Sequence, residues 1–457
     1  MNKLLITSLL TLTFLLTSLS LAADTETVEV MPDNVPALLV KANSSYAAKD
    51  YLTYRKVLQR LRELRPNNSE YMYQLVLAHA LLDEKTDAYN LMLSMQQQGL
   101  GYDFTLTDDS NNIRNTEVFD YINDLMIKAG EAMGESEVAF TLPDSIVLPE
   151  AMAWDESRQS FLIATAAQGS IHAVSQDGES RELLKADDEN GMWAIFGLLV
   201  DQPRNRLWVS SAATRTFSGF EPADKGRSAL FEFDLTSLEL IRRYPVPVDG
   251  GPHVLGSMAL SPNGDIFIVD RVLPIIYSKA ANADKLKAVF ASRDMISMRG
   301  IAIQPDGRLM YVADRELGIK VFDLESRKAG KVALPATLNV GGIDGLYLWD
   351  NHLIMIQNGI NPERVMRLEL DPSGTRVIAV RPLAVAQPEF DAPSFGTLKD
   401  KYLYYFANSQ STSGSGPARP VAVLRTAVDA NADLDPPDMA EYLKILEEHQ
   451  KRKAGNG

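Results

Sequence analysis

The sequence offers few side chains suited to nucleophilic or metal-assisted chemistry. It contains no cysteine and only five dispersed histidines. A cysteine nucleophile, a disulfide, a zinc–thiolate or iron–sulfur site is therefore excluded, and a histidine-rich metal centre is disfavoured. No Gly-x-Ser-x-Gly elbow, phosphate-binding loop or His-Glu-x-x-His run occurs. Serine-hydrolase, nucleotide-binding and zincin functions are disfavoured for that reason.

Two isolated features remain as candidates for chemistry. His253 ends the loop-like run Gly250-Gly-Pro-His253, where it could bind a ligand or act as a base. The alternative is an exposed loop histidine, because no partner can be placed beside it. Residues 429–435 alternate acidic and amide oxygens like the start of an EF-hand, but Ala440 stands where the twelfth-position glutamate would be. That departure favours a solvated linker over a calcium loop.

The chain begins with the pattern of a secretory signal. Lys3 supplies the positive charge, an apolar stretch follows, and Ser20-Leu21-Ala22 offers small residues for cleavage. We expect a signal peptide over residues 1–22 and an exported protein, periplasmic or secreted, without a membrane span after cleavage. The alternative is an uncleaved membrane anchor.

Composition sets the scale of the mature protein. At 457 residues and 46% hydrophobic side chains, the chain is long enough for two domains held by burial alone. Its net charge of −15 argues against nucleic acid, whose phosphates would be repelled. We interpret this charge as an aid to solubility.

Residues 34–130 have helical periodicity. A shift of about 34 positions, the length of a tetratricopeptide unit, places the apolar residues Val57, Leu58 and Leu61 on Leu91, Met92 and Met95. The segment resembles a pair of tetratricopeptide repeats followed by a tail helix. Such a pair either caps the larger domain or offers a groove to a partner.

The larger domain is predicted from a second repeat. Residues 256–271 and 299–315 align, each with an apolar strand, a Pro-Asn-Gly or Pro-Asp-Gly turn and a second apolar strand ending in Asp-Arg. Weaker copies begin near residues 150, 197, 344 and 394. Six copies spaced by about 45–60 residues predict a mainly β fold, a six-bladed β-propeller over residues 137–430.

Both ends of this domain have expected roles. The alternating run at residues 137–142 could pair beside residues 421–426 and close the ring, which would remove exposed sheet edges. Residues 437–453 place Met439, Tyr442 and Leu446 on one helical stripe. We expect a docked C-terminal helix there.

The run Leu148-Pro-Glu-Ala-Met-Ala-Trp-Asp155 resembles the opening of the senescence-marker/gluconolactonase propellers. The segments 206–210, 230–235 and 256–270 are similar to that superfamily and to its NHL-repeat and yellow relatives. The resemblance implies a six-bladed propeller with its site at the top centre.

In the lactonase branch, a calcium-like cation is held there by a Glu, two Asn and an Asp, and the Asp activates water. The resemblance places Glu150 and Asp344 as the two acidic metal ligands, with Asp344 as the catalytic residue. The two asparagine positions fall near Gly256 and Arg299, which cannot replace asparagine. Asn263, Asn339 or Asn358 would have to compensate.

Because two of the four expected metal ligands are missing, the sequence favours a function without a metal for this face of the propeller. Arg299 can pair with Glu150 and Asp344 in an ion-pair network. We therefore predict a binding protein that recognises a small molecule or protein partner through Glu150, Arg299, Asp344 and His253, with no cofactor. The alternative is a lactonase or esterase dependent on Ca²⁺ or another divalent cation.

Overall fold

The computed structural model describes residues 33–247, 250–408 and 420–430. The predicted signal peptide at residues 1–22 and the predicted C-terminal helix at residues 437–453 lie outside these residues, as does most of the acidic run after Asp429. Within the described part, no helix is long and apolar enough to cross a membrane.

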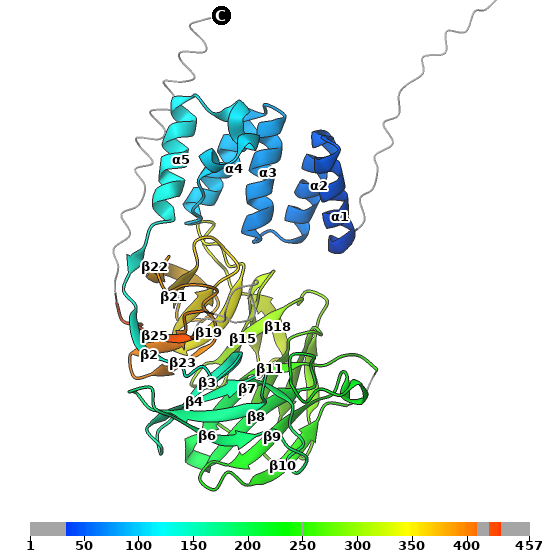
Figure 1. The fold of residues 1–457 in the computed structure, drawn as a ribbon, viewed down its shortest axis with the longest axis vertical. Helices are drawn as coiled ribbons and strands as arrows, with labels where there is room; N and C mark the ends of the chain where they lie inside the picture. The colour runs from blue at the N-terminus through cyan, green and yellow to red at the C-terminus, as the bar shows by residue number, and fades with distance from the viewer. Residues whose placement is uncertain (1–32, 248–249, 409–419, 431–457) are drawn as a thin grey trace, which may run out of the picture.

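The N-terminal part consists of helices that stand side by side as one layer above the propeller (Figure 1). Side-chain oxygens of Asn34, Asp50, Asn68 and Thr116 accept backbone N–H groups at four of the helix starts, which satisfies donors that a helix leaves unpaired. Two short 3₁₀ turns, η1 and η2, cross between the last two helices. The elements are α1 (Val35–Ala47), α2 (Tyr51–Leu64), α3 (Ser69–Leu81), α4 (Lys85–Gln97), η1 (Phe104–Leu106), η2 (Asp108–Ile113) and α5 (Glu117–Ala129).

The remaining described residues form six antiparallel sheets, so the predicted mainly β six-bladed propeller is confirmed. Each blade runs outward from an inner strand along the chain, and the inner strands are neighbours around the ring. The first three blades are β3 (Pro149–Asp155), β4 (Ser160–Thr165), β5 (Ser170–Val174), β6 (Ser180–Lys185); β7 (Ala194–Asp201), β8 (Arg206–Ala212), β9 (Ser228–Asp234), β10 (Leu240–Pro245); and β11 (Leu255–Leu260), β12 (Ile266–Asp270), β13 (Ile275–Lys279), β14 (Lys287–Ala291).

The other three blades follow the same order. They are β15 (Met298–Ile303), β16 (Leu309–Asp314), β17 (Gly318–Asp323), β18 (Lys328–Lys331); β19 (Ile343–Trp349), β20 (His352–Gln357), β21 (Arg364–Leu370), β22 (Val377–Val385); and β23 (Gly396–Lys399), β24 (Tyr402–Phe406), β25 (Ala422–Ala427), β2 (Glu137–Thr141). Short 3₁₀ turns, η3 (Gln202–Arg204) and η4 (Pro222–Asp224), lie in the second blade.

The ring closes as the sequence predicts. Strand β2, from the start of the domain, pairs antiparallel with β25, and Glu137 lies opposite Arg425 while Phe140 lies opposite Val423. Phe140 and Val423 are buried in the core cluster between the last blade and the first. The closing strand therefore joins the two ends of the propeller by both hydrogen bonds and apolar packing.

The helical layer is fastened to the fifth blade. A two-residue strand, β1 (Met133–Gly134), extends that blade by pairing with β22. The buried Arg364 donates to the backbone carbonyls of Gln98 and Gly99 at the end of α4. Ile360, from a propeller loop, is buried in the core of the helical layer. The two parts thus share hydrogen bonds, a sheet edge and apolar surface.

A candidate ligand site at the mouth of the propeller channel

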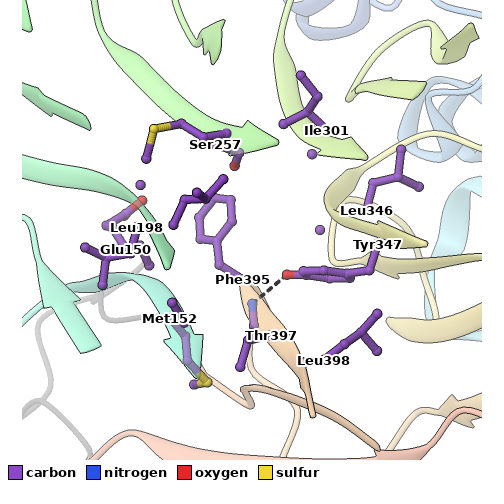
Figure 2. Close-up of a pocket in the computed structure, with 18 of the residues that line it drawn as sticks. Glu150, Met152, Leu198, Ser257, Ile301, Leu346, Tyr347, Phe395, Thr397 and Leu398 are labelled. Atoms are coloured by element: carbon purple, nitrogen blue, oxygen red, sulfur yellow. Dashed lines mark hydrogen bonds between the residues drawn. The ribbon is translucent and has the colours of Figure 1, made fainter. Parts of the chain in front are cut away.

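The inner strands β3, β7, β11, β15, β19 and β23 line a cavity of about 350 Å³ on the propeller axis. Figure 2 shows Met152, Leu198, Ile301 and Leu346 converging on it from four blades. Among the residues that line this cavity, only Glu150 and Asp344 carry a charge. Both of these carboxylates are site residues predicted from the sequence.

A shared backbone irregularity positions the site. In the first five blades the pairing of the inner strand with its neighbour shifts register near the start of the inner strand. A bulge of this kind re-aims a side chain that would otherwise lie between blades. The residues at this position in successive blades, with the matching residue just before β23, are Glu150, Phe196, Gly256, Arg299, Asp344 and Phe395.

Arg271 occupies the space above one of these positions. Its Nη1 donates to Oε2 of Glu150 across 2.7 Å, and its Cζ lies 5.0 Å and 5.3 Å from the ring centroids of Phe196 and Phe395. A Cβ added to Gly256 would lie 2.6 Å from Cγ of Arg271. Gly256 therefore leaves room for the arginine that crosses it, and two aromatic faces stabilise the guanidinium by cation–π contact.

Asp344 is held by three neighbours. Nη1 of Arg315 donates to its Oδ1, and Nε of Arg299 lies 3.7 Å from the same oxygen. Nδ2 of Asn358 donates to its Oδ2 across 2.5 Å. Both carboxylate oxygens of Asp344 are thus engaged by cationic or amide donors. Of the three asparagines considered from the sequence, Asn358 is the one that reaches this site; Asn339 is instead bonded to Gln98 of the helical layer.

Of the three arginines at the channel mouth, Arg299 has the longest contact with a carboxylate. Burial lowers its pKa to about 10, and repulsion from Arg271 adds to the effect, while Asp344 acts in the opposite direction. Its Nη1 donates only to backbone carbonyls, those of Arg271 at 3.4 Å and Met298 at 3.2 Å. The mouth thus holds three guanidinium groups against the two carboxylates of Glu150 and Asp344.

His253 is placed apart from this cluster. It is 3% exposed, and its Nδ1 lies 2.7 Å from Oδ2 of Asp270 and 3.3 Å from the hydroxyl of Tyr277. It is not one of the residues lining the axial cavity. The histidine is therefore buried rather than exposed, and the partner that the sequence could not identify is Asp270.

Glu363 is an ionisable group near the site that sequence reasoning missed. It lies in the loop before β21, and its carboxyl oxygens accept the backbone N–H of Ala392 at 3.1 Å and 3.2 Å. Burial raises its pKa to about 7; the nearby Asp391 adds to this increase and Arg315 opposes it. No motif marks this glutamate, because its environment is made by two loops that are distant in sequence.

The donor set at the mouth does not fit a bound calcium ion. Glu150 and Asp344 are already engaged by Arg271 and Arg315, and the two positions that would supply neutral oxygens carry Gly256 and Arg299. Calcium needs six to eight oxygen ligands and is repelled by adjacent guanidinium groups. Within the described residues, neither carboxylate belongs to a group of three potential metal-binding side chains.

No family model matches the sequence, and no curated protein matches it. Solved structures do, at low identity. One is a calcium-binding protein, regucalcin, from Agrobacterium tumefaciens (15% identity, TM-score 0.47, 66% of this chain and 97% of that one). A putative gluconolactonase (16%, 0.44, 65% and 93%) and a gluconolactonase from Xanthomonas campestris (13%, 0.44, 64% and 89%) also match. The structural neighbours thus include gluconolactonase-like propellers, and at these identities the likeness is one of fold.

Proposed function

We propose that this protein, after export, binds an anionic ligand at the mouth of its propeller channel, with Arg299 as the principal contact. The observation that carries the proposal is the charge imbalance there: the ion pairs of Arg271, Arg299 and Arg315 are made with two carboxylates, those of Glu150 and Asp344. Arg299 lies 3.7 Å from Oδ1 of Asp344 and shares that oxygen with Arg315, so its remaining donors can bind an oxyanion through a bidentate pair of hydrogen bonds.

The local charge matters more than the total charge. The chain carries −15 overall, which would repel anions at long range, but salt limits that field to about 8 Å at physiological ionic strength. At the mouth, a ligand meets a site whose formal charge is +1. A carboxylate or phosphate group is the chemistry that such a site favours.

The alternative is a lactonase or esterase that uses Ca²⁺ or another divalent cation. It requires that the same residues have different partners. Glu150 and Asp344 would have to exchange Arg271 and Arg315 for a cation. Asp344 therefore has no catalytic role in this proposal. The proposal is a binding function, with Glu150 and Asp344 as the carboxylates that orient the arginines.

We propose that the helical layer acts as a cap. Helices α1 to α4 would represent two tetratricopeptide-like units, and the contacts of Arg364 with the end of α4 support a fixed rather than a tethered arrangement. A cap fastened to the fifth blade would limit access to the face that bears Asp344. His253 is buried against Asp270, and in this proposal it stabilises the fold and does not contact the ligand.

The test is a calorimetric titration of the full chain with small oxyanions: acetate, succinate and inorganic phosphate. We expect at least one to bind, and Arg299→Gln to weaken that binding by about tenfold or more. Arg293→Gln is the matched control, because Arg293 is exposed in the loop before β15. Absence of binding, or equal loss in both variants, would refute the proposal.

A further inference from the structure

A second polar cavity lies in the helical layer, apart from the propeller channel. It has a volume of about 380 Å³ and lies between α2 and α4, with the end of α3 contributing to its wall. Helix α2 contributes three residues at intervals of four and three, which places them on one face of the helix. The lining residues are Arg55, Gln59, Arg62, His79, Asp87, Asn90, Leu91 and Ser94.

Part of the charge in this groove is already paired. Nη1 of Arg55 donates to Oε1 of Glu84 across 2.5 Å, and Nδ1 of His79 lies 2.7 Å from Oε2 of the same carboxylate. Glu84 therefore has a partner on each oxygen. Nε of Arg55 is nevertheless buried without a hydrogen-bond partner, so a donor remains unused on the wall of the groove.

Arg62 is the unpaired cation of the groove. It is partly buried, and among the described residues it forms no hydrogen bond or ion pair, while burial alone lowers its pKa. Arg60, two residues earlier on the same helix, is paired with both Asp33 and Glu63. A partly desolvated guanidinium is unfavourable unless something engages its donors. The contrast within one helix marks Arg62 as the group that lacks a partner.

A cation is the other occupant to consider. The ligand atoms of His79, Glu84 and Asp87 lie within 4.8 Å of one another. Arg55 already bonds to Glu84, however, and Arg62 adds a second positive charge to the wall of the same cavity. Two guanidinium groups beside the cluster disfavour a metal ion.

We propose that the groove between α2 and α4 binds a carboxylate group, which Arg62 engages through its guanidinium while Gln59, Asn90 and Ser94 offer neutral donors. A carboxylate fits better than a phosphate because one unpaired guanidinium balances a single charge. Asp87, exposed at the groove, would repel a doubly charged phosphate about twice as strongly as a singly charged carboxylate. The site is independent of the ligand site on the propeller.

The carboxylate could belong to a free acid or to an acidic side chain of a peptide, and calorimetry with two probes separates these sources. Glutarate represents the free acid, and a capped pentapeptide with one central glutamate represents the peptide. The full chain carrying Arg299→Gln is used for both titrations, so that the contribution of heat from the propeller site is reduced. Tighter binding of the pentapeptide assigns a protein partner, and tighter binding of glutarate assigns a small acid.

The variants identify the groove. Adding Arg62→Gln should weaken binding of the preferred probe by about tenfold or more, and Asn90→Ala should weaken it by a smaller factor. Arg60→Gln is the matched control and should leave binding within about twofold. The proposal is overturned if neither probe binds saturably, if Arg62→Gln and Asn90→Ala both bind like their parent, or if inorganic phosphate binds more tightly than glutarate.

Discussion

Arg271 and Arg315 occupy the same position in neighbouring blades, and each donates a hydrogen bond to one of the two carboxylates at the channel mouth. Arg271 reaches Glu150 of the first blade, and Arg315 reaches Asp344 of the fifth. Both arginines follow an aspartate that ends the second strand of its blade. The propeller repeat has therefore placed a pair of guanidinium groups beside the two carboxylates that the sequence resemblance assigned to a metal ion.

The aspartates of these Asp-Arg pairs have a structural role. Oδ1 of Asp270 accepts N–H groups of Val272 and Leu273, and Oδ1 of Asp314 accepts the corresponding groups of Glu316 and Leu317. Each aspartate thus fixes the turn that carries the arginine side chain. This arrangement explains why the dipeptide recurs without requiring either aspartate to act on a ligand.

The pair Glu150–Arg271 should contribute measurably to stability. In a double-mutant cycle with Glu150→Gln and Arg271→Met, we expect a coupling free energy of about 1–3 kcal/mol, because both groups are largely removed from water. Urea denaturation of the four proteins measures it. The exposed pair Glu137–Arg425 is the control and should give less than about 1 kcal/mol. Equal coupling in the two cycles would contradict the assignment.

Glu363 should make stability depend on pH. Its pKa in the folded protein, about 7, lies above the ordinary carboxyl value, so the folded state binds more protons than the unfolded state between about pH 4.5 and 7. Stability should consequently fall as pH rises through that window, by about 1–2 kcal/mol once solvent screening of this part-exposed group is allowed for. Thermal melts of Glu363→Gln should lack this component; an unchanged pH profile would show that Glu363 titrates normally.

His253 should stabilise the fold rather than contact the ligand. His253→Ala removes the buried partner of Asp270, which should cost about 1–3 kcal/mol because an acceptor is left unpaired. A lower melting temperature with unchanged oxyanion affinity is the expected result. Loss of affinity without loss of stability would instead return His253 to the binding site, as the sequence analysis predicted.

The close packing of Gly256 against Arg271 hinders the design of a metal site at the channel mouth. Gly256→Asn with Arg299→Asn supplies two neutral oxygens, but the new side chain at position 256 would collide with Arg271. We therefore expect calcium binding to improve only when Arg271→Ala is added, since that change also frees Glu150. Calcium calorimetry of the double and triple variants decides the point; equal affinities would mean that Arg271 does not obstruct the site.

The inner strands of the propeller were easier to predict from the sequence than the outermost strands. Turns of the Pro-Asn-Gly type and buried apolar runs revealed the inner strands, and the alternation at β2 revealed ring closure. The fourth strands were harder to recognise, because β14 and β18 are mostly exposed and lack an apolar pattern. Their conformation depends on pairing with the third strand rather than on local composition.

The candidate site was predicted in part for a related reason. The repeat alignment placed Glu150, Arg299 and Asp344 at equivalent positions, and the structure brings them to one channel mouth. Arg271 and Arg315 were visible as a repeated Asp-Arg pair, but a long side chain can point in several directions. The space left by Gly256, the rings of Phe196 and Phe395 and the carboxylate of Glu150 together determine where Arg271 lies.

Calcium calorimetry of the unmodified protein tests the central claim most directly. The carboxylates of Glu150 and Asp344 can be neutralised either by guanidinium groups or by a metal ion, but not by both. We predict no stoichiometric binding of calcium at micromolar affinity, and no effect of Glu150→Gln or Asp344→Asn on the calcium titration. Micromolar binding that either substitution abolishes would contradict this account and establish the metal-dependent alternative as the better explanation of the site.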